Sequence, residues 1–413
     1  MQVVYERCCG IDVHKQTVVA CAVVPGADGQ ALKETRTFGT MTENLAALAD
    51  WLGELGVTHV TMESTGVYWK PVFNLLDGRF AILVVNAERL KAMAGRKTDV
   101  QDAEWLADLL RHGLLKGSFI PSEILRELRD LTRYRTKLGD ERKSEVNRVQ
   151  KVLEDANIKL ASVASDVMGV SGRAMLNELV QGQTDAATLA ELAKGRLREK
   201  QKLLQKALSG RVRSHHRFML AQHLAHIDFL DEAMAELDRQ IAEQMRPFAA
   251  ALATWDSLPG INQRIAEILV AELGPDLQPF EDAKHLASWA GMCPGNNESA
   301  GKRKSGRTRK GSPWLRRALI EAAHGAAHTK HKYFQALYRR LASRRGKQRA
   351  AVAVGHSLLV TGYHLITRQT AYEDLGGNYF DERDREAVKR RAVRRLEKLG
   401  YQVDLTPLAA AAG

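Results

Sequence analysis

Residues 7–24 read RCCGIDVHKQTVVACAVV: two short apolar, β-branched runs on either side of a polar break at residues 14–16. Runs of this length and composition predict buried strands, and their close spacing predicts an antiparallel hairpin. The turn sequence PGADGQ follows, and residues 31–38, ALKETRTF, then alternate in polarity as a third strand does. Three consecutive strands therefore lead this part of the chain.

The remainder of the first 120 residues predicts alternating helices and strands. Thr42 is the expected N-cap of an amphipathic helix. Its apolar face would carry Leu45, Leu48, Leu52 and Leu55. A fourth strand (57–64), a short helix (68–76), a fifth strand (79–86) and a helix (99–115) follow. The fifth strand is nearly continuous in apolar residues, as expected of a strand covered on both faces. The order βββαβαβα predicts an α/β domain over residues 1–120, without the regular alternation of a Rossmann fold.

After Pro121 the sequence turns helical. Residues 122–160 and 212–246 carry apolar residues at heptad-like spacing, which predicts either a coiled coil or long helical hairpin, or an ordinary helical bundle. Residues 165–210 predict smaller helices and loops. We expect this helical, coiled-coil region to span residues 121–250, and an all-α domain with one large basic loop (294–312) to span residues 251–413.

Charge indicates a polyanionic partner. The 413 residues include 61 Lys and Arg against 49 Asp and Glu, a net charge of +12. The basic residues cluster after Pro294, between residues 339 and 349, and in KRRAVRRLEK at 389–398. A solubilising surface usually mixes both signs, so these clusters favour binding to phosphates. The expected nucleic-acid-binding residues are Lys302, Arg303, Lys304, Arg307, Arg309, Lys310, Arg316 and Arg317.

Other features narrow the class of protein. Four cysteines without CxxC spacing argue against a zinc site or a disulfide framework. With a mean hydropathy of −0.30 and no apolar run of the length needed to cross a bilayer, we expect a cytoplasmic protein without membrane contact. The histidines lack HExxH spacing, and most are expected to be surface residues or satisfied core residues.

Four carboxylates predict a metal site. Asp12 and Glu63 lie at the ends of two predicted strands, whereas Asp99 and Asp102 share one face at the start of a helix. Clustered carboxylates need a cation to stay ionised together, and oxygen ligands suit Mg²⁺ or Mn²⁺. Asp99 and Asp102 could instead stabilise the helix dipole, but that reading explains neither Asp12 nor Glu63.

The basic loop offers nucleophiles. Ser299, Ser305 and Ser312 lie among Lys and Arg residues and glycines, and a serine so placed could attack a phosphodiester. From the chemistry alone, a loop that only grips phosphate is the favoured interpretation.

Taken together, these motifs resemble the DEDD transposases of bacterial insertion sequences, the IS-one-ten and IS-eleven-eleven group. GIDVHK, MESTGVYW and RKTDVQDAEWLADLL carry the resemblance over residues 7–116. LPGI, AELG, LASWAGMCPGNNESAGK and KGSPWLRRAL carry it over residues 254–330.

The resemblance implies an RNase H-like (RuvC-like) N-terminal domain with Asp12, Glu63, Asp99 and Asp102 as its acidic tetrad. It also implies a coiled-coil dimerisation segment and a nucleophilic serine, which by motif is Ser299. The family usually reads Ser-Gly there, whereas this chain reads Ser-Ala-Gly, so Ser305 stays a second candidate. A structured guide RNA that pairs with target and donor DNA is implied as well.

Three functions compete. The first is a recombinase that cuts through Ser299 and rejoins DNA as a dimer or tetramer, with the tetrad and the serine forming one composite site. The second is a metal-dependent nuclease or junction resolvase that cuts by hydrolysis. The third is a non-catalytic nucleic-acid scaffold. The resemblance favours the first.

Overall fold

The chain forms two compact units, Met1–Pro121 and Ser122–Gly413. A computed structural model describes residues 2–26, 30–64, 66–86, 99–294, 297–299, 302–308 and 310–406. The boundary lies one residue from the predicted end of the first domain. The predicted helical and C-terminal domains both fall in the second unit, and a division between them stays a prediction.

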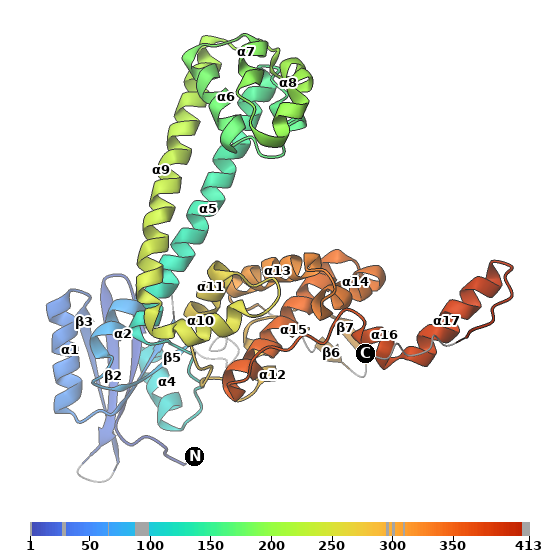
Figure 1. The fold of residues 1–413 in the computed structure, drawn as a ribbon. Helices are drawn as coiled ribbons and strands as arrows, with labels where there is room; N and C mark the ends of the chain where they lie inside the picture. Colours follow the sequence, from blue (N-terminus) through green and yellow to red (C-terminus); the bar gives the residue numbers. More distant parts are fainter. Residues whose placement is uncertain are drawn as a thin grey trace. The chain divides into compact units, whose positions relative to one another are not determined.

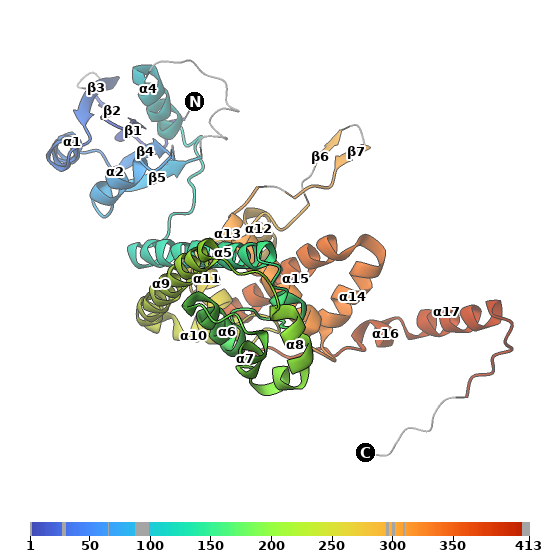
Figure 2. The same ribbon diagram turned by 90° about the horizontal axis from the view of Figure 1, so that it is seen from above.

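The first unit is built on one five-stranded sheet with the strand order β3-β2-β1-β4-β5 (Figures 1 and 2). β1 is antiparallel to β2 and parallel to β4, and β4 is parallel to β5. The strands are β1 (Cys8–Val13), β2 (Thr17–Pro25), β3 (Ala31–Gly39), β4 (His59–Glu63) and β5 (Ala81–Val85). All five predicted strands are confirmed.

Helices cover both faces of this sheet. Cys9, Ile11 and Val13 pack with α1 (Thr42–Glu54) and α2 (Trp69–Leu76). Cys8 and Cys21, which point to the opposite face, pack against α4 (Asp99–Arg111). β1 and β2 are therefore buried on both faces, which explains their continuous apolar runs.

Of two local predictions for this unit, one is wrong and one is confirmed. Thr42 is the first residue of α1, and the N-cap is Met41, which makes no side-chain cap bond. The prediction that β5 is covered on both faces is confirmed. Although β5 is an edge strand, Ile82 and Val84 belong to the core beneath α1 and α2, and Val85 packs with Leu106 of α4 on the other face.

In the second unit, α5 (Glu123–Asp155) and α9 (Ser214–Gln244) form a long antiparallel hairpin (Figure 1). Arg135 forms an ion pair with Asp238, and Arg142 forms one with Asp231. The residue numbers rise along α5 and fall along α9, which shows that the two helices are antiparallel. The hairpin confirms the predicted pair of long helices. Its tip is a small apolar core formed with η1 (Leu160–Ser162), α6 (Val170–Gln181), α7 (Ala186–Glu191), η2 (Gly195–Lys200) and α8 (Gln201–Leu208).

Among the described residues, the rest of the unit is helical except for one small hairpin. Its elements are η3 (Arg246–Phe248), α10 (Ala249–Asp256), α11 (Gln263–Leu273), α12 (Ala283–Trp289), β6 (Asn297–Ser299), β7 (Lys302–Ser305), α13 (Pro313–His328), α14 (Tyr333–Arg345), α15 (Lys347–Arg368), α16 (Tyr379–Arg383) and α17 (Arg385–Lys398). The predicted loop 294–312 thus contains a β-hairpin.

α15 is long and apolar enough to cross a membrane by length and composition alone. Its buried residues, which include Ala350, Val354 and Leu358, lie along one side of the helix. Gly355 lies close against the backbone of Leu319 in α13. This is the packing of a core helix, and it explains why α15 is so apolar.

Candidate functional site

Asp12 and Glu63 lie side by side at one edge of the sheet. β1 and β4 are parallel, and the last registered pair is Ile11 with Met62, so the next residue on each strand is Asp12 and Glu63 respectively. Ile11 and Met62 belong to the core beneath α1 and α2. Because side chains alternate along a strand, Asp12 and Glu63 belong to the opposite face, which α4 covers.

α4 runs antiparallel to β1 in direct backbone contact. A Cβ atom on Gly10 would lie 2.3 Å from the carbonyl oxygen of Ala103 and 2.4 Å from the backbone nitrogen of Ala107. Further back along β1, the Cys8 thiol donates to the carbonyl oxygen of Ala107 at 3.7 Å. The C-terminal end of β1 therefore lies beside the N-terminal end of α4.

This packing brings the start of α4 to the end of β1. Asp99 is the first residue of α4, and Asp102 follows one turn later. Asp102 is half-buried and directly precedes Ala103, which meets Gly10. The side chain of Asp99 lies outside the described residues. The backbone thus places all four predicted carboxylate residues at one corner, where β1, β4 and α4 meet.

The Asp12 carboxylate is largely enclosed, with 16% of its side chain exposed. Its Oδ2 lies 3.1 Å from Nε2 of His14, a residue that sequence reasoning left among the ordinary histidines. Oxygen donors on converging elements, with one partly buried, form a donor set that fits Mg²⁺ or Mn²⁺. His14 follows Asp12 by two residues, and only that spacing within GIDVHK could have drawn attention to it.

A second group of potential metal ligands lies at the tip of the helical hairpin. Among the described residues, Asp155, His215 and His216 bring three ligand atoms within 4.8 Å of one another. However, Nδ1 of His216 accepts a hydrogen bond from the backbone N–H of Arg213, and its Nε2 lies 2.7 Å from Asp155 Oδ2. A neutral ring that accepts at Nδ1 carries its proton on Nε2, so His216 has no lone pair left for a metal. The group is a cap for α9 and does not fit a metal ion.

Ser299 ends β6 beside the turn of the small hairpin. It pairs with Lys302 across the two strands, whereas Ser305 pairs with Asn297 at the opposite end. The structure describes only the backbone of Ser299, Ser305 and the β7 cations, and Arg309 lies outside the described residues. Ser299 is therefore the serine nearer the tip, and Ser305 the one nearer the base.

The base of this hairpin is fixed to the helices around it. Pro294 and Thr308 form an antiparallel bridge. Arg316 donates from Nη1 to the carbonyl oxygen of Gly291 and to Thr308 Oγ1, each at 2.8 Å. A Cβ on Gly311 would lie 2.4 Å from the backbone of Ala290, so the two segments are in backbone contact. The strands thus extend from a rigid base.

A buried carboxylate joins this base to α5. The Glu272 side chain is 1% exposed and accepts from Arg133 at 2.7 and 3.0 Å and from Ser312 Oγ at 3.1 Å. Ser312 in turn is the N-cap of α13 and accepts from the backbone N–H of Leu315. Sequence reasoning missed Glu272 and Arg133, because 139 residues separate them.

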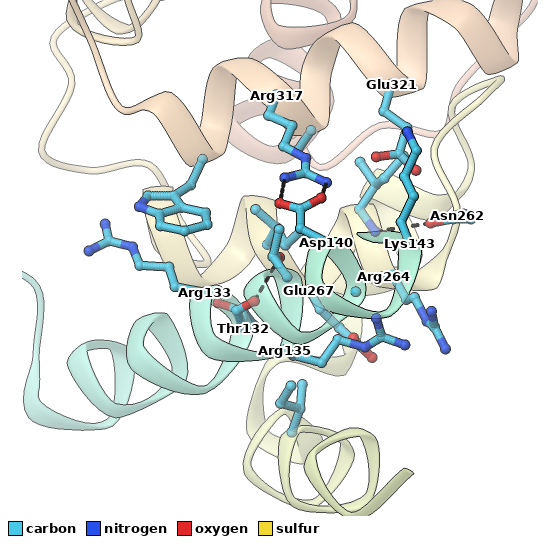
Figure 3. Close-up of a pocket in the computed structure, with 17 residues that line it drawn as sticks. Thr132, Arg133, Arg135, Asp140, Lys143, Asn262, Arg264, Glu267, Arg317 and Glu321 are labelled. Atoms are coloured by element: carbon cyan, nitrogen blue, oxygen red, sulfur yellow. Dashed lines mark hydrogen bonds and ion pairs between the residues drawn. The ribbon is translucent and has the colours of Figure 1, made fainter. Parts of the chain in front are cut away.

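A cavity of about 310 Å³ lies between α5, α11 and α13 (Figure 3). Arg317 from α13 forms a two-bond ion pair with Asp140 of α5 at its wall, with Nη2 to Oδ1 at 2.7 Å. Arg317 holds the pKa of Asp140 below its usual value through this hydrogen bond. Glu267 lines the same cavity, and burial raises its pKa.

The predicted phosphate-binding residues therefore have different surroundings. The side chains of Arg316 and Arg317 contact other parts of the protein. Arg307 and Lys310 are exposed, although each also has an interaction within the protein. Lys302, Arg303 and Lys304 form most of β7.

Comparison with known proteins identifies both units. Residues 9–158 match the DEDD transposase family of the IS110 type, described as "Transposase", and residues 253–339 match the "Transposase IS116/IS110/IS902 family". The chain is 24% identical to the pilin gene-inverting protein of Moraxella bovis, over 88% of this chain and 97% of that protein. It is 27% identical to an uncharacterized 44.8 kDa protein of insertion element IS116 from Streptomyces clavuligerus, over 69% of this chain and 75% of that protein. With the two matched domains in order along one chain, and with relatives that align over most of their length, this protein is a transposase of the IS110 family, a DNA recombinase.

Proposed function

We propose that this transposase cuts and rejoins DNA through Ser299, while Asp12, Glu63, Asp99 and Asp102 hold Mg²⁺ or Mn²⁺ beside the reacting phosphate. The observation that carries the proposal is the convergence of the four carboxylate positions where β1, β4 and α4 meet. The sheet order and the position of these residues suit an RNase H-like domain, the fold that the resemblance implies.

Two bonds change in the proposed cutting step. The Ser299 oxygen forms a bond to the phosphorus of a DNA phosphodiester, and the bond from that phosphorus to a 3′ oxygen breaks. The serine loses its proton to a base, and the departing 3′ oxygen gains one. A 3′-hydroxyl from another strand then attacks the phosphoserine, which restores a phosphodiester and frees the serine. The bond energy is kept in the phosphoserine, so rejoining needs no nucleotide.

The protein residues have separate tasks in this scheme. When bound at the tetrad, a divalent cation would polarise the phosphate and offset its charge. Ser299 suits the nucleophile because it ends β6 beside the hairpin turn, opposite Lys302. The exposed Arg307 and Lys310 and the β7 residues Lys302, Arg303 and Lys304 would grip neighbouring phosphates. Arg316 and Arg317 would act mainly by holding the base of the hairpin, and Arg309 would join the phosphate contacts.

The remaining parts of the proposal concern partners. Target and donor DNA must be held together, so we propose a dimer or tetramer that assembles through the α5–α9 hairpin as a coiled coil. Phe218 and Phe229 on α9 are more than 60% exposed, which suits such a contact. A structured guide RNA would select the DNA, and the setting would be the cytoplasm.

A covalent adduct tests the nucleophile directly. The protein is incubated with Mg²⁺, element-flanking RNA and end-labelled cognate DNA, and protease-sensitive protein–DNA adducts are measured. Ser299→Ala should abolish the adduct, whereas Ser305→Ala, the control in the same hairpin, should keep it. Asp102→Asn should lose cutting yet still bind DNA.

The second candidate is a hydrolytic nuclease, which the acidic corner could support by itself. In that case strands would be cut in the Ser299→Ala protein, no adduct would form with the wild type, and Asp102→Asn alone would stop the reaction. That pattern would refute the serine mechanism. Omitting the RNA tests the guide, because cutting that continues unchanged would remove it from the proposal.

A further inference from the structure

The C-terminal helix α17 (Arg385–Lys398) carries a dense positive charge and has no buried residue. Its sequence, REAVKRRAVRRLEK, contains seven basic residues and two acidic ones. A helix usually owes its stability to an apolar face packed on a core, and α17 has none among the described residues. Its composition therefore calls for an explanation outside the fold.

Five of the seven basic residues of α17 gather on one side. At 3.6 residues per turn, Arg390, Arg391, Arg394, Arg395 and Lys398 fall within an arc of about 140°. Ala392 and Leu396 lie on the opposite side, as do the other two basic residues of the helix, Arg385 and Lys389. We call the five cationic residues the α17 basic face.

Carboxylates do not neutralise this face. Arg390 and Arg391 donate from Nε to carbonyl oxygens of their own helix, those of Glu386 and Ala387, at 3.3 and 3.0 Å. Among the described residues, no ion pair joins a carboxylate to the α17 basic face, and the pairs closest in sequence end at Asp384. Like charges four residues apart, as in Arg390 and Arg394, destabilise a helix. A polyanion bound to the face would remove that repulsion.

The start of α17 is anchored to α14. Tyr333 of α14 lies 5.3 Å from the ring of Tyr379 and 5.2 Å from that of Phe380, both on α16. Arg340 of α14 lies 5.2 Å above the Phe380 ring and 3.4 Å from Asp384, the residue before α17. α17 then extends away from the other helices of its unit (Figures 1 and 2). The basic face is thus carried on a helix that is fixed at one end and open to solvent.

We propose that the α17 basic face binds the phosphates of duplex DNA, as a second DNA contact separate from the β6–β7 hairpin. The geometry favours B-form DNA, because its major groove is about 12 Å wide and admits an α-helix, whereas the deep, narrow major groove of A-form RNA does not. The inference rests on the chain acting on DNA, and it depends on neither Ser299 nor the acidic tetrad.

The test is the salt dependence of DNA binding by the full chain. Binding of the protein to a labelled DNA duplex is measured in EDTA at several salt concentrations, so that no cutting occurs. The variant replaces four arginines by glutamine, a residue of similar helix propensity: Arg390→Gln, Arg391→Gln, Arg394→Gln and Arg395→Gln. Because these side chains are exposed and pack on no core, the variant should fold as the wild type does, which circular dichroism checks.

A control variant of equal net charge changes four exposed cations around the hairpin tip: Lys151→Gln, Arg196→Gln, Lys202→Gln and Lys206→Gln. For the α17 variant, the slope of log K against log salt should fall in magnitude by about 1.8 to 3.6, since each lost phosphate contact removes about 0.9. At 0.2 M salt its affinity should drop by about tenfold or more. The control should keep the wild-type slope.

Three results would overturn the proposal. The α17 variant could keep the wild-type slope, or the control could lose as much as the α17 variant does. The α17 variant could also lose binding only to an RNA duplex or to anionic phospholipid vesicles, which are measured in parallel. Because no cutting is involved, failure of the serine mechanism would leave this result intact, and the reverse also holds.

Discussion

Gly10 is the position where one methyl group should disturb the acidic corner. The Cβ of Gly10→Ala would lie 2.3 Å from the Ala103 carbonyl oxygen and 2.4 Å from the Ala107 nitrogen, both of them backbone atoms. Neither atom can rotate away, so α4 must move by about 1 Å to restore ordinary contact. Overpacking of this kind costs about 1–3 kcal/mol of folding free energy.

The same shift should reach the chemistry. Asp102 directly precedes Ala103, so α4 would carry it away from Asp12 and Glu63. A displacement of about 1 Å at a reacting site can cost about 100-fold in rate. We therefore expect Gly10→Ala to lower both the stability of the first unit and the rate of DNA cutting, while DNA binding changes little.

Two measurements separate these effects. Hydrogen exchange of the β1 and α4 peptides reports local stability, and single-turnover cutting reports the rate at saturating Mg²⁺. Gly53→Ala is the matched control, since the nearest atom to its added Cβ is the Arg79 side chain at 4.0 Å. In a helix this control should be neutral or stabilise by up to about 1 kcal/mol. If Gly10→Ala exchanged and cut as the wild type does, the close packing of α4 on β1 would be refuted.

Three further predictions concern the second unit. Ser312→Ala removes the N-cap of α13 and one hydrogen bond to Glu272, so the free energy of unfolding measured in urea should fall by about 1–2 kcal/mol. Ser312→Thr should retain most of the stability. Equal losses in the two variants would contradict the capping role. The raised pKa of Glu267 means that the folded state holds its proton to higher pH, so its contribution to stability falls as pH rises through that pKa. Glu267→Gln should reduce this loss of stability with rising pH and raise the melting temperature at pH 8. A melting temperature that depends on pH as the wild type's does would contradict the role of Glu267. Finally, if the cluster of Asp155, His215 and His216 is only a helix cap, His215→Ala should leave the zinc content and the melting temperature unchanged. If the wild type bound zinc and this variant lost it, the cluster would be a metal site.

How far the sequence predicts this structure depends on how local each signal is. The strands around Asp12 and Glu63 follow from polarity patterns of a few residues, and the parallel pairing of β1 with β4 then brings their ends together. The bounds of α14 and α17 within the predicted all-α domain were not predicted, because dense Arg and Lys mask their helical period. The histidine beside Asp12 was passed over because its only local signal is its position two residues after Asp12, which does not by itself mark a ligand.

Contacts that are distant in sequence account for most of what was missed in the second unit. Glu272 resembles any other helix carboxylate until α5 brings Arg133 to it across 139 residues. Arg317 resembles a phosphate ligand until the fold brings Asp140 to it across 177 residues. In each case a local pattern supplies the charge, and only the tertiary packing supplies its partner.

The eight predicted phosphate-binding cations therefore divide between two tasks that a count of charges cannot separate. Arg316 ties Gly291 to Thr308, and Arg317 ties α13 to α5, so both hold the base from which β6 and β7 extend. If all eight predicted cations met phosphates, they would contribute about 7 to the magnitude of the slope of log K for DNA binding against log salt. Without these two arginines the contribution would be about 5. The arginines that fix the base are as necessary to the proposed reaction as those that grip DNA, because a serine nucleophile needs a rigid support as much as it needs positive charge around it.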